Sequence, residues 1–291
     1  MGFAINAMNR LHQGKVTAAL RKQPAVYFFA QRQWNRTQST YFQDVCSRIG
    51  PPSDAGNAAV VSPTVDVPDL ETVVSKLPDF VLAGEDFSRE MAQWCSTSKF
   101  LSRTLRPDSC GYQDIYAHIL SNLRGIDVRL LEIGIGINDP AAESGMSVDH
   151  RPGASLAGWC NYFPGAEVHG ADVDRRCLVD TDHYRTHFVD QRDPQSLQQL
   201  ARELGGGFDL VVDDGLHTPE ANANVMATFL PLLKPHGILV IEDILKDFET
   251  LWAGAAEYLP RGYRLDYFPN TVLRQLRGPR GEVGIAVLTR R

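Results

Sequence analysis

Arg129-Leu-Leu-Glu-Ile-Gly-Ile-Gly-Ile137 is the stretch that best predicts the fold. An apolar run at 128–131 leads into Glu132, Gly134 and Gly136. This order is typical of a buried strand that ends in a glycine turn. Because glycine has no side chain, a ligand can lie directly against the backbone of such a turn. Plain structural turns show the same pattern, so the stretch alone predicts only a candidate cofactor site.

The composition is that of a globular protein. The 291 residues suffice for one large domain with an extension, or for two modest domains. A net charge of -6 argues against a general nucleic-acid binder, and no run approaches the roughly 18 apolar residues of a membrane span. The five cysteines are scattered, without CxxC spacing, so neither a zinc site nor a disulfide framework is indicated. We expect reduced thiols in a cytoplasmic protein.

A helical extension is expected over residues 1–110. Residues 1–43 contain no acidic side chain, and helix formers run through 4–30 with breaks at Gly14 and Pro24. We interpret this segment as an arm that packs on the body or on a second subunit. The alternative is peripheral contact of a basic segment with an anionic membrane or an acidic partner. The Pro- and Gly-rich residues 50–69 predict a linker, followed by helices at 70–77 and 87–101.

The remainder, 111–291, alternates between helical and strand patterns. Strands are predicted at 128–131, 167–173, 186–189, 208–212, 238–241 and 283–288, and helices at 112–123, 155–162, 194–204, 219–233 and 248–258. This alternation predicts an α/β domain whose mostly parallel sheet carries helices on both faces. Ligands of such sheets bind beyond the carboxyl ends of the strands. The functional residues are therefore expected directly after each strand.

A carboxylate follows every predicted strand of this core. The residues are Glu132, then Asp172 and Asp174, then Asp190 and Asp193, then Asp213 and Asp214, and last Glu242 and Asp243. Any one of them can be a turn residue or a helix cap. Negative charges packed along one rim, however, raise the free energy unless cations or hydroxyl donors compensate. The rim therefore predicts a polar binding site.

A nucleoside fits the first part of this rim. Asp172, at the end of the second strand, is placed to accept hydrogen bonds from a ribose diol, while the glycine turn admits the rest of the ligand. A dinucleotide-binding fold requires GxGxxG leading directly into a helix. Here Gly136 is followed by Ile-Asn-Asp-Pro140 and a polar loop, which weakens an NAD interpretation.

A metal fits the second part. Asp213-Asp214 and Glu242-Asp243 end adjacent strands of the expected sheet, so three or four carboxylates are expected to converge. Hard oxygen ligands of this kind suit Mg²⁺ better than Ca²⁺ or Mn²⁺ at such a site. The alternative is that one of the two pairs caps a helix.

Over about 125–290 the chain resembles the class I S-adenosylmethionine-dependent methyltransferases. The resemblance implies a Rossmann-like sheet with S-adenosylmethionine as cofactor. It places Glu132, Gly134 and Gly136 beside the methionine end and Asp172 at the ribose. It also places Asp190 and Gln191 by the adenine, and Asp213 is expected to contribute to the same cofactor site.

Two segments narrow the resemblance to metal-dependent sugar O-methyltransferases, which act on macrolide deoxysugars or on mycobacterial methylmannose polysaccharide precursors. They are 208–217 and 232–243. Cys110-Gly-Tyr112 also resembles a segment of that group, which commonly has His-Gly-Tyr. Leu245 stands where members often have histidine, and 143–151 differs from the shorter glycine-rich loop of the group. The resemblance implies Mg²⁺-dependent methyl transfer to a hydroxyl of a sugar or glycoside.

Such a transfer needs help with the acceptor proton, because an alcohol is a poor nucleophile at neutral pH. A divalent metal lowers the pKa of an oxygen that it binds, and a nearby base completes the task. We expect Asp213, Glu242 and Asp243 to bind the metal and His217 to act as the base. Asp214 is the second candidate base, and His150 could act as base or contact the acceptor.

Two other functions stay open from the sequence. One is O-methylation of a small phenol or catechol, the same reaction on a flatter acceptor. The other is a non-catalytic protein that binds S-adenosylmethionine or a partner. In each case we expect a homo-oligomer that binds no nucleic acid.

Overall fold

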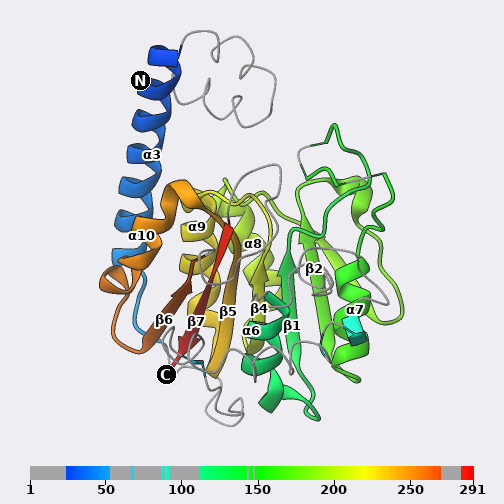
Figure 1. Cartoon of the computed structure of the whole chain (residues 1–291). Coiled ribbons are helices and arrows are strands. Elements are labelled where there is room, and N and C mark those ends of the chain that lie inside the picture. Colours follow the sequence, from blue (N-terminus) through cyan, green and yellow to red (C-terminus); the bar gives the residue numbers. More distant parts are fainter. Residues whose placement is uncertain are drawn as a thin grey trace.

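The structure, a computed structural model, describes residues 24–52, 67–68, 87, 89–91, 112–142, 144–146, 148–269 and 283–291. Its centre is a seven-stranded sheet in the order β3-β2-β1-β4-β5-β7-β6 (Figure 1). The strands are β1 (Arg129–Ile133), β2 (Glu167–Asp172), β3 (Tyr184–Phe188), β4 (Phe208–Asp213), β5 (Leu233–Leu245), β6 (Tyr263–Phe268) and β7 (Val283–Arg290). The first five are parallel, and β7 runs antiparallel between β5 and β6. The predicted α/β fold with a mostly parallel sheet is confirmed.

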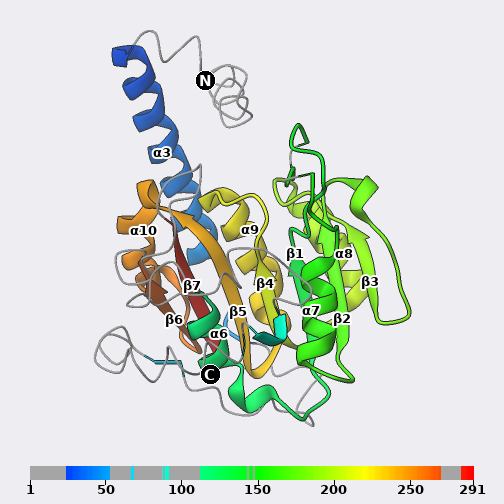
Figure 2. The ribbon, with the colours of Figure 1, turned by 45° about the vertical axis from the view of Figure 1, so that its right-hand side comes forward.

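Helices cover both faces of this sheet (Figure 2). One face carries α6 (Tyr112–Ile119) and α7 (Ala154–Tyr162), and the other carries α3 (Pro24–Ser47), α8 (Pro194–Leu204), α9 (Pro219–Phe229) and α10 (Glu249–Ala253). Short 3-10 turns adjoin several of them, at Ser121–Leu123, Leu230–Leu232, Lys246–Phe248 and Ala255–Tyr258, and another at Arg175–Cys177 follows β2. The helices predicted at 219–233 and 248–258 are therefore real but partly of the tighter 3-10 type.

The two hydrophobic cores follow from the alternation of side chains along the strands. Leu130 packs on one face of the sheet with Trp159 of α7, and Leu131 packs on the other with Phe229 of α9. Successive strand residues point to opposite faces, so a continuous apolar strand feeds both cores. Burial of each such side chain contributes about 1.5–3 kcal/mol.

Two helices on the α9 side begin at N-cap residues of the types that usually start helices. The Asp193 carboxylate accepts from the Gln195 amide at 2.9 Å to start α8, and the Thr218 hydroxyl accepts from the Ala221 amide at 3.3 Å to start α9. Each cap is followed by proline at the first helical position, where the missing N–H costs nothing. Asp193 is thus a helix cap rather than part of the ligand rim.

The described part of the N-terminal extension, α3, lies alongside α9 in both ribbon views (Figures 1 and 2). Gln38 Nε2 donates to Glu220 Oε2 at 3.0 Å, and Tyr41 OH donates to Asn224 Oδ1 at 2.8 Å. Pro24, expected to break the helix, is the first described residue of α3. Residues 1–23, most of the 50–69 linker, all of 70–77 and most of 87–101 lie outside the described residues, so the domain boundary near 110 stays a prediction.

Within the described part of the chain, no helix has the length and apolar character needed to cross a bilayer.

Candidate functional site

The glycine turn after β1 is held between the two neighbouring strands. Gly134 N donates to Ala171 O at 2.8 Å, and Asp214 N donates to Ile133 O, also at 2.8 Å. Gly134 has φ 93°, and a Cβ built there would lie 2.3 Å from the Asp214 carbonyl oxygen. Only glycine fits this position, because both the backbone conformation and the space exclude a side chain. The turn and the exit of β4 are therefore in direct contact.

Asp172 lies beneath this turn. Its Oδ2 accepts from the amides of Ile135 at 3.1 Å and Gly136 at 3.0 Å, while its Oδ1 accepts from Asp174 N at 2.8 Å. The side chain is almost completely buried. In this structure Asp172 shapes the backbone of the glycine turn, and its contact with a ribose stays a prediction.

The loop after the turn folds back over it. Ile137 exchanges backbone hydrogen bonds with Ser144 and Met146, at 3.0 and 2.7 Å. A Cβ on Gly136 would lie 2.7 Å from Met146 Cγ. His150 Nε2 lies 3.1 Å from the Ile135 carbonyl oxygen. His150, predicted to act as a base or to contact the acceptor substrate, therefore lies against the turn. The loop thus forms one wall of the candidate site.

An arginine on the β2 side anchors that loop. Arg176 contacts Asp139 at 3.0 Å and Asp174 at 2.6 Å. The Ala141 amide and then Arg176 lower the pKa of Asp139. Hydrogen bonds from Arg176 likewise lower the pKa of Asp174. These carboxylates are therefore partnered by a cation within the protein.

Asp190 and Gln191, expected beside an adenine, have protein partners here. Burial alone would raise the pKa of Asp190, but hydrogen bonds from the Arg192 side chain and amide outweigh it and lower that pKa. Gln191 is buried: its Nε2 donates to Asp213 Oδ1 at 2.6 Å, and its Oε1 accepts from Leu216 N at 2.7 Å. Gln191 thus fixes the loop after β4.

Asp213, expected as both metal ligand and cofactor contact, is completely buried. Besides Gln191, its carboxylate accepts from Asn222 Nδ2 at 2.9 Å and from Gly215 N at 3.3 Å. Burial raises the pKa of Asp213, and those donors and His217 oppose the rise. The structure therefore places Asp213 inside the fold, where it holds the β4 exit loop together, and outside the metal-like group.

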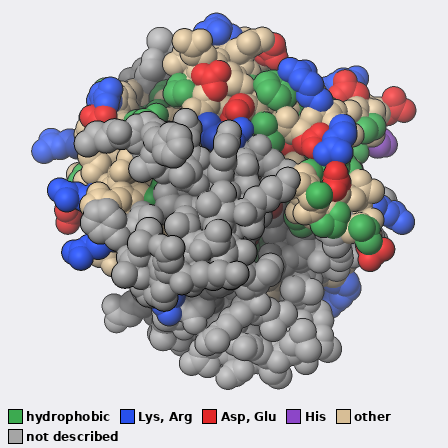
Figure 3. Space-filling model, turned by 90° about the horizontal axis from the view of Figure 1, so that it is seen from above, with side chains coloured by type: hydrophobic (Ala, Val, Ile, Leu, Met, Phe, Trp, Pro, Cys, Tyr) green, Lys and Arg blue, Asp and Glu red, His purple; other side chains and the backbone are tan. Residues whose placement is uncertain are grey.

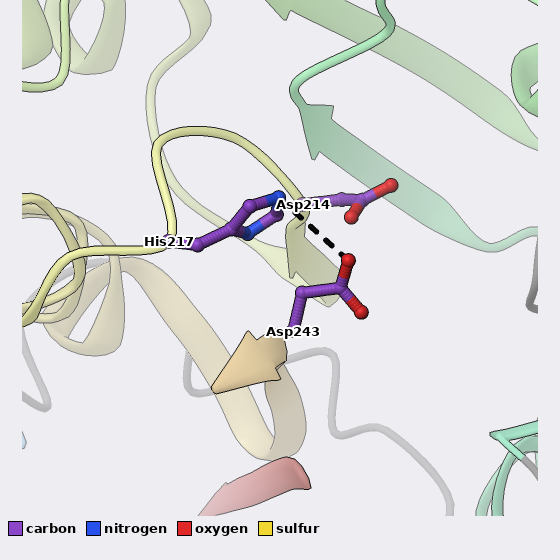
Figure 4. A group of neighbouring side chains, drawn as sticks. All are labelled: Asp214, His217 and Asp243. Atoms are coloured by element: carbon purple, nitrogen blue, oxygen red, sulfur yellow. Dashed lines mark ion pairs between the residues drawn. The ribbon is translucent and has the colours of Figure 1, made fainter. Parts of the chain in front are cut away.

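That group consists of Asp214, His217 and Asp243 (Figure 4). Asp214 follows β4, His217 lies in the next loop, and Asp243 lies near the end of β5. One potential ligand atom from each lies within 4.8 Å of the others, and His217 Nε2 is 3.8 Å from Asp243 Oδ2. All three are partly accessible. Two carboxylates and an imidazole form a donor set that fits a divalent cation.

Glu132 and Glu242 lie deeper, each within reach of an aromatic donor. Trp159 Nε1 donates to Glu132 Oε2 at 3.1 Å, and Tyr116 OH donates to Glu242 Oε1. Both carboxylates are buried. Burial, followed by the charge of Glu242, raises the pKa of Tyr116 well above its usual range, so the phenol remains a donor. Sequence reasoning missed Trp159, Tyr116 and Asn222, since nothing in an apolar helix marks which residues reach a rim carboxylate.

Charges of both signs are mixed on the face seen in Figure 3. Acidic and basic side chains of the described residues lie next to one another there rather than in separate patches. On this face the described residues therefore create no electrostatic field of a single sign that would attract a polyanion.

A family model described as a methyltransferase domain matches residues 133–244. The matched region runs from the glycine turn to the end of β5, and so spans Asp214, His217 and Asp243. Residues 133–244 form a methyltransferase domain. Its strand order and parallel core are the Rossmann-like arrangement that the resemblance implied.

Among the relatives of this methyltransferase domain is the mycinamicin VI 2''-O-methyltransferase of Micromonospora griseorubida. It is 30% identical over 200 residues, which are 65% of this chain and 47% of the relative. Demethylmacrocin O-methyltransferase of Streptomyces fradiae is 33% identical over 131 residues, 45% of this chain and 30% of the relative. The chain thus spans less than half the length of these curated relatives. Among solved structures, the MycE methyltransferase in complex with Mg, SAH and mycinamycin VI matches with a TM-score of 0.52 and 19% identity, covering 90% of this chain and 92% of that one.

Proposed function

We propose that the protein transfers the methyl group of S-adenosylmethionine to a hydroxyl of a sugar or glycoside, with Mg²⁺ bound by Asp214 and Asp243. One observation carries the proposal: the glycine turn lies against the backbone of Asp214. A Cβ built on Gly134 would lie only 2.3 Å from the Asp214 carbonyl oxygen. The cofactor turn and the metal-like group therefore belong to one site. In this proposal Asp214 takes the metal-ligand role expected of Asp213. Glu242, also expected as a ligand, is buried and accepts a hydrogen bond from Tyr116.

The backbone of the glycine turn is the part that fits the cofactor. Gly134 and Gly136 have positive φ and add no side chain of their own to the turn, and Asp172 accepts from the amides of Ile135 and Gly136. We propose that Glu132 and Asp172 orient the cofactor through this backbone. The loop containing Met146 and His150 closes the far side. When bound, S-adenosylmethionine supplies an electrophilic methyl group on sulfur.

The acceptor hydroxyl needs alignment and a place for its proton. We assign the proton to His217 Nε2, which lies 3.8 Å from Asp243 Oδ2. Imidazole suits this role because its ordinary pKa lies near neutral pH. As the methyl carbon–sulfur bond breaks and the new oxygen–methyl bond forms, the hydroxyl proton passes to His217. A Mg²⁺ ion held by Asp214 and Asp243 would supply Lewis acidity at this site.

Sugar-bearing acceptors are supported by the relatives. Their names include mycinamicin VI, demethylmacrocin and rhamnosyl tetracenomycin, and the reactions named are O-methylations. We extend this acceptor class to the present chain, and oligosaccharides such as methylmannose precursors belong to it. A cytoplasmic setting is proposed as well, because the described cysteines Cys46, Cys160 and Cys177 are free thiols.

The test is a methyl-transfer assay with labelled S-adenosylmethionine on a panel of glycosides, oligosaccharides, phenols and catechols. We expect product only from sugar hydroxyls, loss of activity with EDTA, and recovery with Mg²⁺. Asp214→Asn should lower turnover at least 100-fold. Asp182→Asn, an exposed carboxylate at the amino end of β3, is the control and should leave turnover unchanged. Activity that ignores the chelator contradicts the metal, and transfer to phenols alone contradicts the acceptor class.

A further inference from the structure

Asp243 occupies an irregular point of β5. Ile241 pairs with Ala286 and Ile244 with Gly284, so three steps along β5 are matched by two along β7. Asp243 itself has φ 51°, in the left-handed region that non-glycine residues rarely adopt. A bulge of this kind redirects the side chains around it. The direction of the Asp243 carboxylate therefore depends on whatever stabilises the bulge.

Tyr112 is the side chain that contacts this bulge. Its hydroxyl oxygen accepts from Asp243 N at 3.1 Å, and its single proton is shared between Asp243 Oδ1 and Gly284 O, each at 3.0 Å. One phenol thus joins the backbone and carboxylate of Asp243 to β7. The ring is completely buried.

The two oxygens of Asp243 consequently face different partners. Oδ1 lies against Tyr112, whereas Oδ2 lies 3.8 Å from His217 Nε2. A carboxylate held at one oxygen cannot rotate freely, so the other oxygen stays directed at Asp214 and His217. Tyr116, one turn further along α6, donates to Glu242. Helix α6 therefore supplies one phenol to each member of the Glu-Asp pair.

We propose that Tyr112 is a positioning residue for the divalent cation: it fixes the left-handed backbone of Asp243 and aims its free carboxylate oxygen at the metal site. The inference rests on the proposed function, because it presumes that Asp243 binds the cation. Loss of an outer partner that orients a ligand typically weakens metal binding about 10- to 100-fold.

The experiment measures Mn²⁺ binding to the full chain, with Mn²⁺ as the paramagnetic stand-in for Mg²⁺. Free Mn²⁺ is titrated by electron paramagnetic resonance against wild type, Tyr112→Phe and Tyr41→Phe. Tyr41 is the matched control, because its hydroxyl also bonds a side chain but lies on α3. We expect Mn²⁺ affinity to fall about 10-fold or more for Tyr112→Phe and to stay within twofold for the control.

Further readouts separate positioning from general stability. In Tyr112→Phe the Mg²⁺ concentration for half-maximal activity should rise, and turnover should recover at saturating Mg²⁺. Replacing Tyr112 by 4-aminophenylalanine restores a donor and should return Mn²⁺ affinity to within threefold of wild type. If Tyr112→Phe does not fold by circular dichroism, 4-fluorophenylalanine at the same position fills the space without a donor and serves instead.

Each outcome bears on one of the two proposals. Equal Mn²⁺ affinity for wild type and the donor-free variant overturns the positioning role while leaving the metal site intact. A failure of 4-aminophenylalanine to restore binding also overturns it. Absence of Mn²⁺ binding to wild type overturns the metal site itself, and the role of Tyr112 with it.

Discussion

Gln191 Nε2 lies 2.6 Å from Asp213 Oδ1, and the other end of the same amide accepts the Leu216 N–H at 2.7 Å. A single buried side chain thus closes the loop that carries Asp214 and His217. Asn224 of α9 donates in turn to the Gln191 carbonyl oxygen at 2.9 Å. The loop that carries the candidate site therefore rests on a network of neutral amide side chains around the buried carboxyl of Asp213.

Gln191→Leu should destabilise the fold by about 1–3 kcal/mol, because Asp213 and Leu216 N each lose a buried partner. Urea unfolding followed by circular dichroism measures this. Gln199→Leu is the control, since exposed Gln199 donates to exposed Glu203 on α8, and its effect should stay within about 0.5 kcal/mol. Equal effects of the two changes contradict the importance of the network.

Gly134→Ala should cost about 1–3 kcal/mol more than Gly125→Ala. Both glycines have positive φ, 93° and 85°, but a Cβ at Gly125 meets nothing within 4 Å. The difference in stability between the two variants therefore reports the clash of the new Cβ with the Asp214 backbone. Its expected size is that seen for overpacked cores. Thermal unfolding measures it, and isothermal titration with S-adenosylmethionine should show weaker binding for Gly134→Ala only. A similar loss in both variants means that backbone strain alone matters.

His217→Gln should separate base from ligand. If His217 is the base, the variant should keep its Mn²⁺ affinity within about threefold of wild type, while its turnover should fall about 10²- to 10⁴-fold. Electron paramagnetic resonance and the transfer assay measure the two quantities on the same sample. Loss of Mn²⁺ binding makes His217 a metal ligand and leaves the proton to another group.

Arg176→Gln should raise the pKa of Asp139 toward its ordinary 3.8 without restoring it fully, since the Ala141 amide is the larger cause of the depression. A carboxyl with a depressed pKa stabilises the fold above its ordinary pKa and loses that contribution as pH falls through the folded value. The Asp139–Arg176 contact should therefore hold at neutral pH and open only below pH 3.8. Carboxyl ¹³C titration by NMR tests this, with the pKa of Asp190 as the internal control.

The sheet was largely predictable because buried parallel strands are continuous apolar runs bounded by turns. Strand β6, Tyr-Arg-Leu-Asp-Tyr-Phe268, was missed although its residues alternate between apolar and polar, because the strands were predicted mainly from continuous apolar runs. Strand β5 was predicted at 238–241 but runs from Leu233 to Leu245, through Pro235 and the bulge.

The rim of carboxylates was predictable, but not which member faces the site. Asp213 and Asp214 are neighbours at a strand end, and successive side chains point to opposite sides. Which of the two is buried depends on Asn222 and Gln191, which come from other elements. The same holds for Glu242 and Asp243, whose directions depend on a bulge and on two tyrosines of α6. Such partners come from residues far apart in the chain, so local patterns do not reveal them.

The place of β7 in the sheet has a consequence for biosynthesis. Because β7 lies between β5 and β6, those two strands cannot complete their pairing until residues 283–290 have left the ribosome. Gly284, whose carbonyl oxygen accepts from the Tyr112 hydroxyl, belongs to the same strand. A nascent chain that already holds every carboxylate of the rim therefore still lacks the strand against which Asp243 is set, and the site cannot form before β7 has been made.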